Sequence, residues 1–188
     1  MLMPNWSIFA ICGLHWLLLS GSLHAESDAL AQSKDVALLV VGGSLARPLN
    51  LTGADLKKLP RQTARSTDKN GQEIVFQGVL IRDVLKEAGI KFGDKQSRGD
   101  LLLSYLVIEA ADGYKVLFAL SDFEADLTDK LLLLADTADD KPIDVKDGPL
   151  RLIIPDEKKH ARWVRQVVSL KVVRTPDRQK PSDNDKKH

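Results

Sequence analysis

The stretch LLLSYLVIEAADGYKVLFAL, residues 101–120, decides the fold. Residues 101–110 are almost continuously apolar, which predicts a strand in the middle of a β-sheet. Asp112-Gly113 indicates a tight turn, because both residue types favour turn conformations. After this turn, alternate residues are apolar and share one face of a second strand; they are Tyr114, Val116, Phe118 and Leu120. We therefore expect two adjoining strands that contribute strongly to the core.

Further strands and short helices are expected on both sides of this stretch. The predicted strands are 36–41, 61–67, 73–78, 131–135, 150–154 and 167–173. Asn70-Gly71 predicts the hairpin turn between the second and third of these. The predicted helices cover 51–56, where Thr52 is a good N-cap, and 80–88. Ser121 and Glu124 have capping-box spacing, and 136–148 is expected to be a polar loop. Strands interleaved with short helices predict an α+β domain with mixed β-sheet.

The two ends of the chain differ in composition from this domain. The apolar run at 6–19 is followed by small residues, which predicts a signal peptide over 1–25 with Ala25 as the last residue removed. No Lys or Arg precedes the run, so an uncleaved anchor stays open as the alternative. The single domain is expected over 26–173, and 174–188 is expected to be a disordered charged tail. The prediction is a periplasmic or secreted protein without a membrane span after cleavage.

Composition excludes several functions. The net charge of +1 argues against a nucleic-acid-binding protein. The single cysteine is Cys12, inside the predicted signal peptide, so the mature chain is expected to lack disulfides and thiolate ligands. No dinucleotide-binding, Walker or nucleophile-elbow motif occurs. The aspartates between 136 and 147 do not follow the spacing of an EF-hand loop, and a solvated turn is the favoured interpretation.

One basic cluster is a candidate binding site. The residues KKHARW, 158–163, follow a predicted buried strand, and several cationic side chains in a short connection can bind a phosphate or another anion. The alternative is a solvated basic loop with a tryptophan in the core. Arg65 could join such a site from the neighbouring strand, or face solvent on an alternating strand, which is the favoured interpretation.

Taken in order, several segments resemble one family. They are LTGADLKKLPR (51–61), VFQGVLIRDVLKEAG (75–89), VIEAADGYKVLFALSD (107–122), LLLAD (132–136), DGPLRLIIP (147–155) and RWVRQVVSLKV (162–172). The sequence resembles the oxidoreductase molybdopterin-binding domain, which has the sulfite-oxidase-type fold. This resemblance implies a pterin–molybdenum cofactor whose metal is bound by a cysteine located after the strand that follows "LPR". Residues 63–71 lack that cysteine. The resemblance also implies that Lys158, Lys159 and Arg162 lie near the cofactor phosphate.

The sequence therefore supports three hypotheses about function. The first is an exported module that binds a small anionic or heterocyclic ligand, or a redox or other periplasmic protein partner, without molybdenum–thiolate chemistry. Its candidate binding residues are Lys158, Lys159, Arg162 and Arg65, with no catalytic residue and no metal ligand assigned. The second is a molybdopterin-dependent oxidoreductase, since the resemblance alone makes molybdopterin a candidate cofactor. The third is a pure protein-interaction module. Whether the protein is an enzyme stays open.

Overall fold

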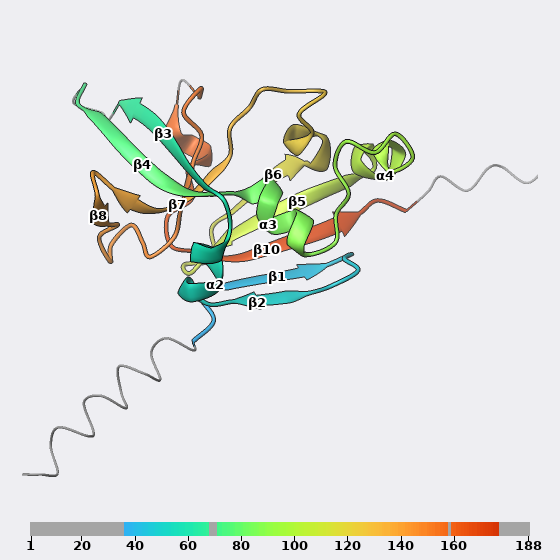
Figure 1. The fold of residues 1–188 in the computed structure, drawn as a ribbon, viewed down its shortest axis with the longest axis horizontal. Coiled ribbons are helices and arrows are strands. Elements are labelled where there is room, and N and C mark those ends of the chain that lie inside the picture. The colour runs from blue at the N-terminus through green and yellow to red at the C-terminus, as the bar shows by residue number, and fades with distance from the viewer. Residues whose placement is uncertain (1–35, 68–70, 158, 177–188) are drawn as a thin grey trace, which may run out of the picture. The chain divides into compact units, whose positions relative to one another are not determined.

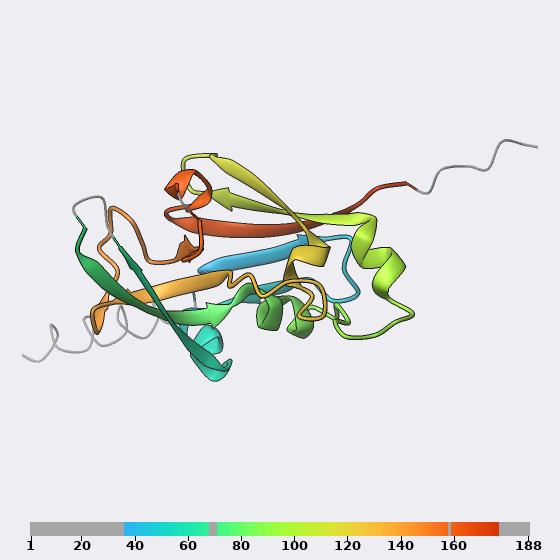
Figure 2. The ribbon, with the colours of Figure 1, turned by 90° about the horizontal axis from the view of Figure 1, so that it is seen from above.

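Ten strands form two β-sheets in the computed structural model, which describes residues 36–67, 71–157 and 159–176 (Figure 1). The first sheet has the order β2-β1-β10-β5-β6. Its strands are β1 (Leu39–Gly43), β2 (Leu49–Leu51), β5 (Ser104–Ala110), β6 (Lys115–Ala119) and β10 (Val167–Arg174). β10 pairs in parallel with β1 and antiparallel with β5, so the last strand of the chain lies in the middle of this sheet (Figure 2).

The second sheet has the order β3-β4-β7-β8, and β9 also pairs with β7. Its strands are β3 (Arg61–Thr67), β4 (Glu73–Leu80), β7 (Leu133–Ala138), β8 (Lys141–Pro142) and β9 (Arg151–Ile153). At the β4–β7 pairing the backbones approach so closely that a Cβ on Gly78 would lie 2.1 Å from the Leu134 carbonyl oxygen. Buried residues of both sheets belong to one hydrophobic core.

Short helices connect the strands. They are α2 (Gly53–Lys58), α3 (Ile81–Glu87), α4 (Arg98–Leu102) and the 3-10 helices η1 (Leu120–Phe123) and η2 (His160–Arg162). Thr52 caps α2 as predicted: its hydroxyl accepts from the Asp55 N–H, and the Asp55 carboxylate accepts from the Thr52 N–H. The α+β class and the β3–β4 hairpin are confirmed, with Thr67 opposite Glu73. Asn70 of the predicted turn lies outside the described residues, and Gly71 has a positive φ of 83°.

Several predicted boundaries are wrong. The apolar run at 101–110 begins in α4, and β5 starts at Ser104, because Leu102 and Leu103 are exposed and only the later residues alternate between core and surface. The expected capping box at Ser121 and Glu124 does not form; the Glu124 carboxylate is buried and accepts from the Gly93 N–H at 2.7 Å.

Two further boundaries move outward. The predicted loop over 136–148 begins inside β7, which turns through Asp139 and Asp140, both with positive φ, into β8. The predicted tail boundary at 174 is too early, because Arg174 belongs to β10 and the Thr175 N–H donates to the Leu103 carbonyl. The predicted signal peptide with Cys12, and residues 177–188, lie outside the described residues. No helix in the described ranges has the length and apolarity needed to cross a bilayer.

Candidate functional site

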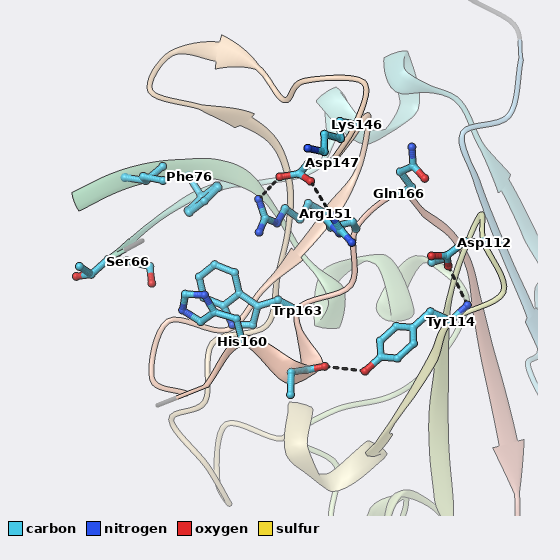
Figure 3. Close-up of a pocket in the computed structure, with 15 residues that line it drawn as sticks. Ser66, Phe76, Asp112, Tyr114, Lys146, Asp147, Arg151, His160, Trp163 and Gln166 are labelled. Atoms are coloured by element: carbon cyan, nitrogen blue, oxygen red, sulfur yellow. Dashed lines mark hydrogen bonds and ion pairs between the residues drawn. The ribbon is translucent and has the colours of Figure 1, made fainter. Parts of the chain in front are cut away.

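A cavity of about 760 Å³ opens between the end of β3, the β5–β6 turn and the segments that flank β9 and η2 (Figure 3). Ligand pockets in proteins commonly have volumes of about 300–1,000 Å³. The charged side chains that line it are Asp112, Lys146, Asp147, Arg151 and Arg165, and the imidazole of His160 lines it as well. Ser66 and Thr67 reach it from β3, and Phe76 reaches it from β4. The cavity therefore combines charged groups with an aromatic wall.

The aromatic wall is formed around Arg151. Its guanidinium carbon lies 5.9 Å from the ring centroid of Phe76 and 5.7 Å from that of Trp163. The two rings meet edge to face, with centroids 6.0 Å apart. His160 stacks on Trp163 at 3.8 Å with an interplanar angle of 17°, and Figure 3 shows the two rings overlapping. The Trp163 indole N–H donates to the Ile154 carbonyl at 3.1 Å, which fixes the ring against the core.

Asp147 neutralises only part of the positive charge. Its carboxylate accepts from Arg151 at 2.7 Å, and its second oxygen lies 3.5 Å from Arg165. Burial lowers the pKa of the Arg151 guanidinium, Asp147 raises it, and the nearby Arg165 lowers it again. Lys146 adjoins Asp147 in sequence, lines the same cavity and is exposed. Two carboxylates, Asp147 and Asp112, thus share the cavity with three cations, and the group best placed to meet an incoming anion is the half-exposed Arg165.

Gln166 fixes the loop that carries Lys146 and Asp147. Its amide side chain donates to the Val145 carbonyl at 3.0 Å, and its backbone N–H donates to the Asp147 carbonyl at 3.0 Å. Its φ is +47°, a left-handed conformation that is unfavourable for a residue with a side chain. Strained residues of this kind persist where surrounding contacts determine them, and they occur often at binding sites.

The sequence-predicted site residues that the structure describes do not line the cavity. Arg65 is exposed and its guanidinium donates to Glu73 at 2.7 Å. Arg162 pairs with Glu157 and lies 4.8 Å from the Phe118 ring centroid. Lys159 is exposed and does not line the cavity. Lys158 lies outside the described residues.

Sequence reasoning missed the three cations that do line the cavity, Lys146, Arg151 and Arg165. Arg151 was hidden inside a predicted buried strand, and Lys146 inside a predicted polar loop. Two signals in the sequence could have found them. Asp147 and Arg151 are four positions apart across a turn. Arg165 lies two positions before the last described strand begins at Val167. His160, which the cluster 158–163 included, is the part of that prediction that the cavity contains.

The residues of the cavity do not provide a molybdenum–thiolate centre. The sequence has no cysteine beyond Cys12. The resemblance implies a metal ligand just after β3, and the described residues there that line the cavity are Ser66 and Thr67, which carry hydroxyls. A hydroxyl is a harder and much less acidic donor than a thiol. Within the part of the chain that the structure describes, no three His, Asp or Glu side chains come together as metal ligands.

Fold and cavity together define an α+β domain of the sulfite-oxidase type. The chain belongs to the oxidoreductase molybdopterin binding domain family, whose model matches residues 29–181. A solved structure, the sulfane dehydrogenase SoxCD from Paracoccus pantotrophus, is similar in fold, with a TM-score of 0.57 and 22% identity. The match covers 74% of this chain and 38% of that one, so this chain spans well under half of its length. No curated protein matches the sequence.

Proposed function

We propose that this protein is an exported binding module that holds a small anion carrying a planar ring, without molybdenum–thiolate chemistry. The observation that carries the proposal is the cavity beside Trp163, where the cations Lys146, Arg151 and Arg165 outnumber the carboxylates Asp112 and Asp147. An anionic group binds to Arg165 and Lys146 through charge-assisted hydrogen bonds. The exposed His160, stacked on Trp163, offers a surface on which a flat ring extends the stack.

Ligand binding is tested by comparing two double variants. The first, Lys146→Ala with Arg165→Ala, removes the two exposed cations of the cavity. The matched control, Lys91→Ala with Lys95→Ala, removes two exposed lysines that do not line it. The probes are inorganic phosphate and phenyl phosphate, and the readout is the midpoint of thermal unfolding. A ligand that binds only the folded state raises this midpoint by mass action.

We expect phenyl phosphate to stabilise the wild type more than phosphate does, and the control to behave like the wild type. The cavity variant should lose most of the shift. In protein cleaved after Ala25, as we propose, Trp163 is the single tryptophan, so quenching of its fluorescence by phenyl phosphate locates the ring. Equal shifts in both double variants, or no shift with either probe in the wild type, would contradict the proposal.

The main rival is a molybdopterin-dependent oxidoreductase with unusual metal ligation. It is tested by elemental analysis of protein purified from its natural host. Molybdenum at one atom per chain would contradict our proposal of a binding module without molybdenum chemistry. Substoichiometric molybdenum together with an anion-dependent thermal shift supports the binding module.

Export is a separate part of the proposal. It is supported by the apolar run at 6–19 and the small residues that precede Glu26. Sequencing the N-terminus of the protein isolated from its host should find Glu26 as the first residue, in an extracytoplasmic fraction. Protein that begins at Met1 and stays in the cytoplasm would contradict this part and leave the binding site to be judged on its own.

A further inference from the structure

A second, smaller hollow of about 190 Å³ lies beside the start of α3, away from the cavity described above. Its apolar lining comes from Leu80, Phe123, Ala125, Leu131 and Leu132. Its polar lining comes from Arg82, Thr128, Asp129 and Lys130. None of these residues lines the larger cavity. The Ile81 N–H donates to the Leu132 carbonyl at 3.1 Å, which holds the two walls together.

Arg82 differs from the other arginines that the structure describes. Each of the others forms an ion pair with a carboxylate, and Arg82 forms none. Its Nε atom is buried and has no hydrogen-bond partner. A buried donor without an acceptor is costly. The Arg82 side chain thus lines the hollow without a carboxylate partner of its own.

Lys130 adds a second cation with a weak partner. Its ammonium lies 3.9 Å from the Asp122 carboxylate, the long limit of an ion pair. Its backbone is held by a hydrogen bond from its N–H to the Thr128 hydroxyl at 3.1 Å. Asp129 also lines the hollow, but it is exposed, so water screens its charge. The apolar floor strengthens the interaction of Arg82 and Lys130 with an anion, because the local dielectric is low.

We infer that this hollow is a second binding site, for a single small oxyanion such as a phosphate or a carboxylate group. The planar fork of the Arg82 guanidinium matches the geometry of both groups. The hollow has room for an oxyanion together with ordered water. The larger cavity and this site are independent, because they share no residue.

The experiment follows backbone amide resonances of the full chain during titration with inorganic phosphate, and separately with acetate. It is done in the Lys146→Ala, Arg165→Ala background, so that the larger cavity contributes little. We expect shifts in the amides of residues 80–82 and 128–132 that saturate with anion concentration. Arg82→Gln should weaken this binding by about tenfold or more, since charged hydrogen bonds are the strong ones. Arg65→Gln, an exposed arginine outside the hollow, should leave it unchanged.

The two probes distinguish the sources of the oxyanion. Saturation with phosphate alone assigns a phosphate site, and saturation with both assigns a general oxyanion site. Arg82→Lys keeps the positive charge but lacks the planar guanidinium, so we expect partial binding. Partial binding in this variant also shows that the α3 region still folds. If neither probe shifts these amides at tens of millimolar, or if Arg82→Gln responds like its parent, the hollow holds only water and the inference is wrong. Neither outcome touches the larger cavity.

Discussion

Arg151 begins β9 and Arg162 ends η2, and both lie near aromatic rings, yet their surroundings differ. The Arg151 side chain is 21% exposed, lies between Phe76 and Trp163, and shares its carboxylate with Arg165. The Arg162 side chain is 40% exposed and has Glu157 to itself. The number of basic residues in a segment therefore does not locate an anion site. We propose instead that such a site lies where positive charge exceeds the local carboxylates and faces a cavity.

The largest effect is expected from Trp163→Ala. The ring is buried and contacts Phe76, His160 and Arg151, so its removal leaves a cavity and should cost about 4 kcal/mol of unfolding free energy. Phenyl phosphate binding should be lost as well. Urea unfolding measures the first effect and calorimetry the second. If folded Trp163→Ala binds phenyl phosphate as tightly as the wild type does, the aromatic wall around Arg151 is not part of the binding site.

Arg151→Met should cost about 2 kcal/mol, because it removes one partner of a half-buried ion pair and a cation from between two rings. Asp147 is then free to neutralise Arg165, so phosphate affinity should fall although Arg165 is still present. Arg162→Met is the matched control, because Arg162 also lies near an aromatic ring but does not line the cavity. It should leave phosphate affinity unchanged. A lower phosphate affinity in both variants would show that Arg151 and Arg162 do not differ in their role in anion binding.

The ion pair of Arg61 with Asp136 offers a test by pH. Burial tends to raise the pKa of Asp136, but hydrogen bonds from Arg61 and Thr137 outweigh it and lower the pKa below 3.8. The pair therefore stabilises the fold above about pH 4 and loses this contribution as the pH falls through the lowered pKa. Asp136→Asn should cost about 1.5 kcal/mol at pH 7, and the difference from wild type should shrink at pH 3. A constant difference in urea unfolding at both pH values would contradict the assignment.

Two substitutions of Gln166 distinguish backbone strain at this residue from its role in positioning the loop that carries Lys146. Gln166→Ala keeps the left-handed backbone and loses the bond to Val145, whereas Gln166→Gly also relieves the strain, so the glycine variant should be about 1 kcal/mol the more stable of the two. Both should bind phosphate more weakly than wild type, because the loop that carries Lys146 is no longer fixed. If the glycine variant binds phosphate as wild type does, Gln166 positions nothing.

The smallest effect is expected from Arg65→Ala. Arg65 and Glu73 are exposed, at 68% and 59% of their side chains, and such pairs contribute under about 0.5 kcal/mol. Phosphate binding should not change. A clear loss of affinity, measured by calorimetry, would return Arg65 to the site that the sequence suggested for it.

Local signals predicted local structure well. The capping box at Thr52 and the β3–β4 hairpin each depend on residues close together in the chain, and both form as expected. The α+β class followed from the alternation of strands and helices. The cavity could not be predicted in this way, because Lys146, Arg151 and Arg165 meet only through the pairing of β9 with β7 and the placement of the chain before β10.

Apolar runs were the other source of error. Residues 101–103 have the composition of a buried strand, yet Leu102 is 61% exposed and α4 contains it. Periodicity cannot separate a short helix from a strand when every residue is apolar. The cluster 158–163 shows a related limit: the sequence shows that several of its side chains are basic, but not that His160 lines the cavity while Lys159 and Arg162 do not.

The position of β10 bears on how the chain matures. The β1–β2 and β5–β6 pairs are local in the sequence, but the first sheet is complete only when residues 167–174 lie between β1 and β5. The pairing of β10 with β1 joins segments more than a hundred positions apart. Contacts of such high sequence separation are slow to form, so we expect this sheet to be completed late in folding.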